Sequence, residues 1–295
     1  MESESQLWRR LSAGLLVVTF VALAGGYLGW LHPLGDSLAV GRVLAIIGVL
    51  VAAVLANIAG LQTASFVSTL VAMICGLQVG LAYFVPGPPG SIAVYQKNLN
   101  YRTAALAEVE ADIRATAPLV ITLQEVSEPN LALVDSLKDS YPYQQVCPGD
   151  GVGGPAVLSR LRMVEGTGFC APGMAAMLVA TEDGRTFWLV SIHLHWPWPY
   201  QQADHVKVLL PVLAKLDGPV IMAGDFNMVR WGHSVRSMAE VTETKPAGPA
   251  LGTYLGFDPF LTLAIDHVFA PYGGRVYLRE AYGSDHYGLL VKVEL

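Results

Sequence analysis

The sequence predicts an α/β domain, built as two packed sheets flanked by helices, that follows three transmembrane helices. The 295-residue chain is 53% hydrophobic and only 14% charged, which is too apolar for one soluble globule. The apolar excess lies before residue 86, in three long uncharged stretches. After residue 90, short strand-like runs are interspersed with amphipathic helical segments, which is typical of a mixed α/β domain.

The three apolar stretches cover residues 11–31, 43–61 and 64–85 and contain no Asp, Glu, Lys or Arg. Each has about 20 residues, enough to cross a bilayer core of about 30 Å. A cleaved signal peptide is the alternative for the first stretch, but its apolar run is longer than usual and two more follow. Arg9 and Arg10 precede the first span, so the positive-inside rule places the amino terminus in the cytoplasm, although Arg42 lies on the other side. We therefore expect a multi-pass protein of the cell (inner) membrane whose residues after Val85 are extracytoplasmic (periplasmic).

Residues 86–90, Pro-Gly-Pro-Pro-Gly, predict a short stiff tether, because neither a helix nor a sheet tolerates this sequence. The domain then comprises residues 91–295, enough for a substantial core. Cys147 and Cys170 are its only cysteines, and in an oxidising compartment they predict a disulfide. Such a bridge would contribute on the order of 3 kcal/mol. Two free buried thiols are the alternative.

Within the domain, hydrophobic periodicity predicts strands and helices in a mixed order. Strands are expected at 92–96, 119–123, 155–159, 174–181, 187–192 and 220–224, and two or three more within 263–270, 275–278 and 287–293. Helices are expected at 103–115, 129–137 and 200–216. Residues 230–262 are rich in Gly, Pro and Thr, which predicts a loop.

Polar clusters follow the apolar runs at five places along the domain. The clearest is Gly224-Asp225-Phe226-Asn227, where side chains two residues apart share one face of an extended chain. A turn in which Asp225 caps the next segment and Asn227 is left-handed is the alternative for this cluster. The others are Lys97-Asn98-Leu99-Asn100, Gln124-Glu125, His193-Leu194-His195, and Asp266-His267 together with Ser284-Asp285-His286.

These clusters give residues 91–295 a resemblance to the endonuclease/exonuclease/phosphatase superfamily, which has the DNase I-like fold. The matching pieces are the strand end at Asn98, QEV at 124–126, LSR at 158–160, SIHLH at 191–195, GDFN at 224–227, IDHVF at 265–269 and SDH at 284–286. The resemblance implies phosphoester hydrolysis on a four-layer α/β/β/α sandwich. It is specific for the superfamily and says little about the substrate.

The resemblance also implies roles for individual residues. Glu125, with Asn98 and Asp285, would hold a divalent cation, Mg²⁺ with Mn²⁺ as an alternative, since both suit oxygen ligands. Asp225 would activate the attacking water and Asn227 would hold the phosphoryl oxygens. His286, oriented by Asp266, and His193 would stabilise the transition state. Substrate contacts are expected from Asn100, Arg160, His195, Trp196 and Trp198.

Two further observations concern the metals. Some nucleases of the superfamily have an acidic residue at the position of Asn100, so this chain has one ligand charge fewer and two tightly held metals are not expected. His193 and His195 share a strand face and suggest a transition-metal pair as an alternative. No nearby Cys or third His completes that pair in the sequence.

The charge of the domain argues against nucleic acid, although it does not exclude it. The domain has 15 Lys and Arg against 21 Asp and Glu, with no basic run, whereas surfaces that bind duplex DNA are basic. Trp196-Pro197-Trp198-Pro199-Tyr200 follows His195 and suggests a loop that contacts lipid headgroups at the bilayer. A rigid aromatic turn packed on the domain is the alternative. We expect a phosphohydrolase acting on a small or lipid-borne phosphoester; a nuclease and an inactive phosphate-binding scaffold are the alternatives, and no protein partner can be inferred.

Overall fold

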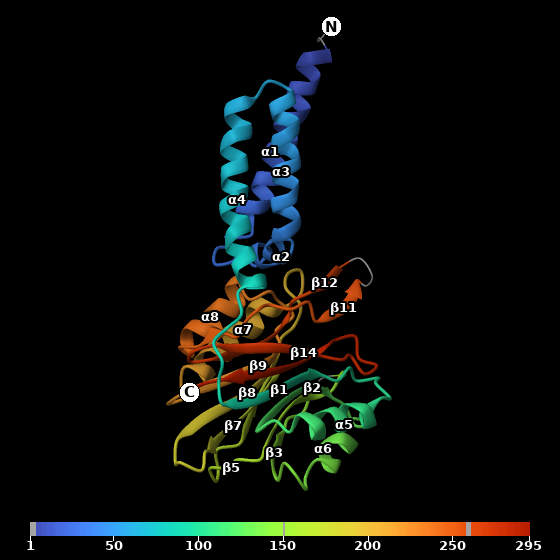
Figure 1. Cartoon of the computed structure of the whole chain (residues 1–295), viewed down its shortest axis with the longest axis vertical. Helices are drawn as coiled ribbons and strands as arrows, with labels where there is room; N and C mark the ends of the chain where they lie inside the picture. Colours follow the sequence, from blue (N-terminus) through green and yellow to red (C-terminus); the bar gives the residue numbers. More distant parts are fainter. Residues whose placement is uncertain (1–3, 150, 258–260) are drawn as a thin grey trace.

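A bundle of helices stands on one side of the α/β domain in the computed structural model, which describes residues 4–149, 151–257 and 261–295. The bundle consists of α1 (Glu4–Gly25), α3 (Arg42–Ile58) and α4 (Gln62–Phe84), with the short α2 (Leu34–Val40) at its base (Figure 1). By length and composition, α1 and α4 can each cross a membrane, and α2 with α3 qualifies as a pair bent by 73°. The amino terminus lies at the end of the bundle remote from the domain.

The bundle differs from the prediction in two places. The first helix runs from Glu4 to Gly25 rather than over 11–31, because Gly25 and Gly26 end it. The residues up to Pro33 then form turns, and α2 follows where a loop was expected. The helices expected at 43–61 and 64–85 are found as α3 and α4 with small shifts at their ends.

The first sheet of the domain has six strands. Their order is β14 (Gly274–Arg279), β15 (Gly288–Val293), β1 (Ile92–Asn98), β2 (Val120–Val126), β4 (Gly154–Ser159) and β3 (Tyr143–Val146). β1 and β2 are parallel, and the other neighbours are antiparallel. The carboxyl ends of β1 and β2 therefore meet at one edge of this sheet.

The second sheet has a path of six strands and one side branch. Their order is β10 (Lys245–Pro246), β13 (Asp266–Ala270), β9 (Val220–Asp225), β8 (Thr186–His193), β7 (Met174–Ala180) and β5 (Arg162–Met163), and β6 (Phe169–Ala171) pairs with β7. β8 and β9 are parallel. A separate hairpin of β11 (Tyr254–Phe257) and β12 (Leu261–Leu263) extends toward the base of the bundle (Figure 1).

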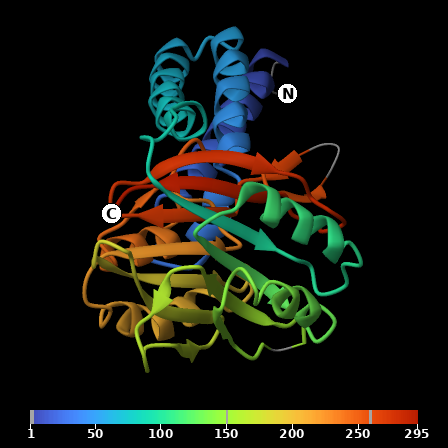
Figure 2. The ribbon, with the colours of Figure 1, turned by 60° about the horizontal axis from the view of Figure 1, so that its bottom comes forward.

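The two sheets pack face to face, and helices cover their outer faces (Figure 2). The core between the sheets is buried and aliphatic, with Val94, Val291 and Ile221 among its members. α5 (Leu106–Thr116) and α6 (Leu131–Ser136) cover the first sheet, and α7 (Gln202–Leu213) and α8 (His233–Val241) cover the second. This arrangement agrees with the α/β/β/α order that the resemblance implies.

The region 230–262 is not the loop that composition predicts. It contains α8, β10 and β11, and the part at 258–260 lies outside the described residues. α8 is only nine residues long and buries Val235 and Met238 against the second sheet. Tertiary packing of this short apolar face overrides the local Gly, Pro and Thr signal.

One disulfide and one hydrogen bond link separate parts of the domain and its tether. Cys147 and Cys170 form a disulfide with their Cα atoms 5.6 Å apart, so the bridged alternative holds. It joins the segment after β3, in the first sheet, to β6 in the second. The tether is also bonded to the domain, because the backbone N–H of Gly87 donates to the carbonyl of Gly248 at 3.0 Å.

Candidate active site

The polar clusters of the sequence meet where the two parallel strand pairs end. Asn98 pairs in register with Gln124 between β1 and β2, next to Glu125. His193 lies opposite Asp225 between β8 and β9, and Asp225 lies opposite Asp266 across β13. The packing of the two sheets brings both sets of strand ends to one place, as the hydrogen bond between Asn98 and Asp225 demonstrates.

His286 and Asp266 form a buried pair at the centre of the site. The Nδ1 atom of His286 is 2.7 Å from a carboxylate oxygen of Asp266, and both side chains are almost fully buried. Burial alone would lower the pKa of His286, but the charges of Asp266 and Asp225 outweigh it and raise this pKa to about 9. The imidazole is therefore protonated at neutral pH and presents an Nε2–H donor 3.6 Å from Asp225.

Asp225 is buried beside this donor. Its Oδ2 accepts a hydrogen bond from Asn98 Nδ2 at 3.0 Å and lies 3.8 Å from His193 Nε2. Burial raises the pKa of Asp225 to about 7, against the lowering effect of His286. A carboxylate with this pKa is a better proton acceptor at neutral pH than an exposed one.

The structure shows the turn that was the alternative for Asp225 and Asn227, and this turn lies within the cleft. Asn227 has a φ of 48°, and its backbone N–H donates to Asp225 Oδ1 at 2.8 Å. Asn100 and Glu125 also have positive φ, so three of the six non-glycine residues with positive φ in the described chain belong to this site. A positive φ strains the backbone of a non-glycine residue. Residues strained in this way cluster at functional sites, where the surrounding fold holds them in place.

Glu125 and Asp285 are half-buried acids that hydrogen bonds hold in place. Asn98 Nδ2 and the backbone N–H of Tyr101 donate to Glu125, and Asn100 Nδ2 donates to Asp285 at 3.0 Å. Within the described residues neither carboxylate has an ion pair with Lys or Arg, and both line the same cleft. Oxygen donors that lack cationic partners are the donor set that Mg²⁺ and related cations require.

The side-chain amide of Asn98, which was expected to help hold the cation, forms hydrogen bonds with other residues of the site. Its side-chain nitrogen faces Glu125 and Asp225, and its oxygen accepts from the backbone N–H of Asn100 at 2.9 Å. Asn98 thus connects the two carboxylates. Asp225, Asp266 and His286 also have ligand atoms within 4.8 Å of one another, but both oxygens of Asp266 already accept hydrogen bonds, from Gln96 and His286.

A cleft of about 850 Å³ is lined by the polar residues Glu125, His193, Asp225, Asn227, Asp285 and His286, among others. Among its described lining residues none is Lys or Arg, whereas Glu125, Asp225 and Asp285 are acidic. Trp196 and Tyr254 form one wall, with ring centroids 5.3 Å apart, and Tyr254 also lies 5.0 Å from His286. Burial lowers the pKa of His193, another lining residue, so its imidazole is neutral at neutral pH.

Two of the five expected substrate residues line the cleft and three do not. His195 and Trp196 line it, and Asn100 lies behind it, bonded to the lining residue Asp285. Trp198 is outside the described lining and packs toward His32 at the base of the bundle. Arg160 follows the end of β4 remote from the site and stacks over Tyr141 at 4.9 Å, so the LSR motif does not bring it to the substrate.

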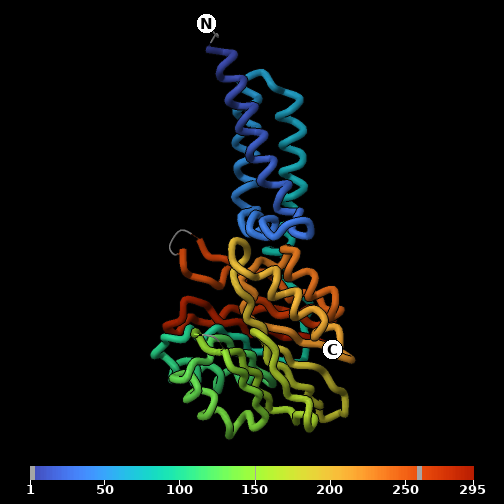
Figure 3. The backbone as a smooth tube through the Cα atoms, turned by 180° about the vertical axis from the view of Figure 1, so that it is seen from behind, coloured from blue at the N-terminus to red at the C-terminus, as the bar shows by residue number. Residues whose placement is uncertain are grey.

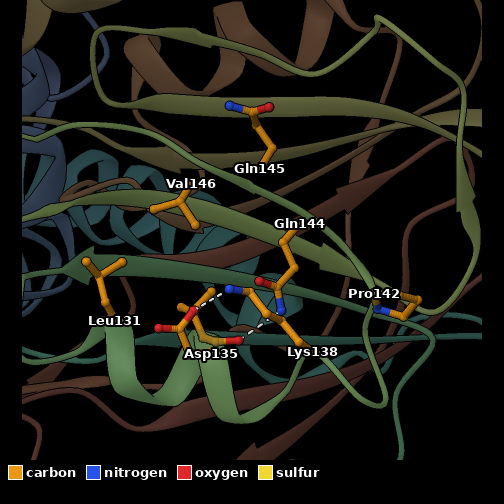
Figure 4. Close-up of a pocket in the computed structure, with 8 residues that line it drawn as sticks. Leu131, Asp135, Lys138, Pro142, Gln144, Gln145 and Val146 are labelled. Atoms are coloured by element: carbon orange, nitrogen blue, oxygen red, sulfur yellow. Dashed lines mark hydrogen bonds and ion pairs between the residues drawn. The ribbon is translucent and has the colours of Figure 1, made fainter.

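A second recess, of about 540 Å³, lies between α6 and β3 (Figure 4). Its charged residues are Asp135 and Lys138, and they neutralise each other at 2.6 Å. Both are well exposed. The acid of this recess is therefore paired with a lysine, unlike the acids of the main cleft, which have no Lys or Arg partner among the described residues.

Sequence reasoning gave no role to three residues that support the site, although it named Lys97 as part of a polar cluster. Gln96 donates to both Gln124 and Asp266. Lys97 is fully buried, and its ammonium donates to the carbonyls of Ala281 and His286, which holds the loop that carries the terminal Ser-Asp-His. Lys97 could have been recognised from the sequence as a supporting residue, because a lysine within a buried strand must have partners for its ammonium group. Tyr254 lies in the segment expected to be a loop and had no such signal.

The comparisons with known proteins agree with this fold. A family model described as "Endonuclease/Exonuclease/phosphatase family" matches residues 93–286. Similar solved structures include an endonuclease/exonuclease/phosphatase from Beutenbergia cavernae (21% identity, TM-score 0.54, 68% of this chain and 70% of that one). A humanized D. rerio TDP2 (20%, 0.53, 68% and 97%) and sphingomyelinase C from Streptomyces griseocarneus (18%, 0.51, 69% and 99%) are also similar.

At these identities the structural likeness concerns the fold alone. No curated protein matches the sequence. The family model, however, covers well over half of the chain and spans all the strand ends that form the cleft. The chain therefore belongs to the endonuclease/exonuclease/phosphatase family.

Proposed function

We propose that this protein is a membrane-anchored, Mg²⁺-dependent phosphodiesterase that hydrolyses a lipid-borne phosphoester on the extracytoplasmic side of the cell (inner) membrane. The observation that carries the proposal is the convergence, in one cleft, of three acids without Lys or Arg partners among the described residues and a protonated histidine. Glu125 and Asp285 would hold the cation, with Mn²⁺ as an alternative to Mg²⁺. The metal, when bound, would supply positive charge to the phosphoryl oxygens.

The residues of the chain supply the remaining parts of a phosphoryl transfer. Asp225 would orient the attacking water and take its proton, since burial raises the pKa of Asp225 to about 7. His286 would donate its Nε2–H to a phosphoryl oxygen, while Asp266 keeps the proton on its Nδ1. The remaining amide hydrogen of Asn227 would bind another phosphoryl oxygen.

His193 would act at the leaving oxygen. It lies 3.8 Å from Asp225 and 3.9 Å from Glu125 in the cleft. Burial favours its neutral form, so it would donate a hydrogen bond from its N–H to the departing oxygen. That oxygen would take up a proton from solvent, and Asp225 would return to solvent the proton taken from the attacking water. A bell-shaped pH dependence is the usual result when a base and a donor act together.

The charge of the cleft favours a diester over a monoester. No Lys or Arg is present among its described lining residues to offset Glu125, Asp225 and Asp285. A phosphodiester carries one negative charge at neutral pH, whereas a monoester carries nearly two, since the second pKa of a phosphate ester is about 6. The same lack of cations, with the net charge of −6, argues against nucleic acid.

The aromatic wall of the cleft and the helical bundle support a substrate held in the membrane. Trp196 and Tyr254 line the cleft, and Trp198 of the same loop lies near His32 of the bundle. Trp and Tyr favour the interfacial region of a bilayer. A lipid headgroup is therefore the phosphoester we propose, with α1, α4 and the bent pair of α2 and α3 as the anchor.

The test uses the full chain in detergent with 4-nitrophenyl esters of phosphate. We expect bis(4-nitrophenyl) phosphate to be hydrolysed with Mg²⁺ and not with EDTA, and 4-nitrophenyl phosphate to be a poorer substrate by roughly tenfold or more, because of its extra charge. Arg160→Ala is the matched control, since Arg160 stacks on Tyr141 away from the cleft. Faster hydrolysis of the monoester would contradict the diester assignment, and activity that survives EDTA would contradict the metal.

A further inference from the structure

Asp36 of α2 bonds the base of the bundle to the catalytic domain. It is 4% exposed, and its two oxygens accept from the backbone N–H groups of His233 at 2.6 Å and Ser234 at 3.1 Å. The Ser234 hydroxyl also donates to it. These are the first N–H groups of α8, whose own preceding residue, Gly232, has no side chain to cap them. A carboxylate from the membrane segment thus caps a helix of the domain.

Other contacts surround Asp36 and extend the same interface. The indole N–H of Trp231 donates to the carbonyl of Ala39 at 2.9 Å, and Ala39 is fully buried among residues of the second sheet and α8. The ring of Trp231 packs edge-on against Tyr83 of α4. Farther along, the N–H of Ala250 donates to the carbonyl of Ala82. The domain is therefore packed on the bundle at several places.

This interface continues into the wall of the cleft. The hydroxyl of Ser37 donates to the carbonyl of Trp198, and the ring of His32 lies 6.5 Å from that of Trp198. Trp196 and Tyr200 of the same loop line the cleft. Seen from behind, the segment that joins β9 of the second sheet to α8 lies next to the base of the bundle (Figure 3). One loop thus has the cleft on one side and the membrane segment on the other.

We infer that Asp36 is a docking residue, which fixes the catalytic domain on the bundle with the cleft held at the bilayer surface. As a consequence the enzyme hydrolyses phosphoesters in the membrane that anchors it. The part of this inference that concerns lipid rests on the proposed function. A domain on a free tether would sample many orientations, whereas a docked domain keeps its cleft in the orientation that a headgroup requires.

The test reconstitutes the full chain in phosphatidylcholine/phosphatidylglycerol vesicles that contain headgroup-labelled phospholipid. A parallel sample places the labelled lipid only in added protein-free vesicles. We expect hydrolysis in the protein's own vesicles to be at least about tenfold faster, since anchoring raises the effective substrate concentration. Asp36→Ala and, from the other side of the contact, Ser234→Ala should each lower this rate severalfold while bis(4-nitrophenyl) phosphate hydrolysis stays within about twofold.

Docking is measured separately from activity. Spin labels at Leu31→Cys, on the bundle, and Asp204→Cys, on α7, occupy exposed positions, in a chain whose free Cys75 is changed to Ser. A narrow distance distribution should broaden in Asp36→Ala and stay narrow in the matched control Asp135→Ala, whose carboxylate pairs with Lys138 in the remote recess (Figure 4).

Each result decides one question. An unchanged distance distribution in both Asp36→Ala and Ser234→Ala would overturn the docking role. Parallel loss of diester hydrolysis would also overturn it, because the variants would then damage the domain itself. If the wild type cleaves the soluble diester and no lipid, the lipid part of the proposed function is wrong, while the label distances still decide whether Asp36 docks the domain.

Discussion

The cleft and the junction between bundle and domain both contain carboxylates removed from water, but the surroundings of these carboxylates differ. At the junction, N–H groups at the start of α8 satisfy both oxygens of Asp36. In the cleft, Glu125 and Asp285 lack Lys or Arg partners among the described residues, and burial raises the pKa of Asp225 to about 7. The carboxylate of Asp36 is thus fully used inside the fold, whereas the half-buried Glu125 and Asp285 remain accessible to a ligand in the cleft.

The largest effect that tests this contrast is expected for Asp266→Asn. The amide cannot hold the proton on Nδ1 of His286 or support its positive charge, so we expect kcat for bis(4-nitrophenyl) phosphate to fall by about 10²–10⁴. The matched change at the junction, Asp36→Asn, should leave this kcat within about twofold, since the cap lies outside the cleft. If Asp266→Asn keeps more than a tenth of the activity, or if both variants lose activity equally, the cleft and junction carboxylates do not differ in their importance for catalysis.

Metal binding gives the next largest difference. If Glu125 and Asp285 hold Mg²⁺, saturating Mg²⁺ should stabilise the folded chain by about 2.7 kcal/mol at one hundred times the dissociation constant. Thermal unfolding in detergent, with and without Mg²⁺, measures this gain. Glu125→Gln should remove most of it, and Asp36→Ala should lower stability without changing the gain. A Mg²⁺ effect of the same size in Glu125→Gln would show that the cation binds elsewhere.

The cleft was largely predictable from sequence, because its residues are polar groups placed at the ends of apolar runs. Asp225, Glu125 and His193 each end a strand, and parallel pairing brings such ends together without any knowledge of side-chain packing. Arg160 illustrates the limit of this reasoning. Arg160 also follows a strand, but β4 runs antiparallel to β2, so Arg160 lies at the end of the sheet that is remote from the cleft.

The junction was not predictable in the same way. Asp36 lies in a short segment between apolar spans and reads as an ordinary loop acid, and α8 lies in a stretch whose composition predicts a loop. Neither element has a strong local signal, because each is stabilised by the other: the carboxylate caps the helix and the helix satisfies the carboxylate. Contacts between residues about 200 positions apart leave no pattern in the local sequence.

The smallest expected effect is the contribution of His267, a buried imidazole, to the pH dependence of stability. His267 lies on β13 between Phe226 and Phe269, and its Nε2 lies 2.9 Å from the carbonyl of Met228. Burial lowers its pKa from 6.5 to about 3, so the folded state holds it neutral. Above pH 6.5 both states are neutral and it contributes no pH dependence. As the pH falls below 6.5 the unfolded chain takes up the proton and the folded one does not, so stability falls, by about 2 kcal/mol at pH 5.

His267→Gln isolates this contribution, because a glutamine amide can donate to the same carbonyl and does not titrate. We expect the free energy of unfolding of the variant, relative to the wild type, to rise steadily between pH 6.5 and pH 5, as measured by chemical denaturation in detergent. Pairs such as Asp266 and His286 titrate in both proteins and cancel in the difference. A difference that is flat over this range would mean that His267 takes up a proton in the folded state as readily as in the unfolded one. Burial would then not hold its imidazole neutral.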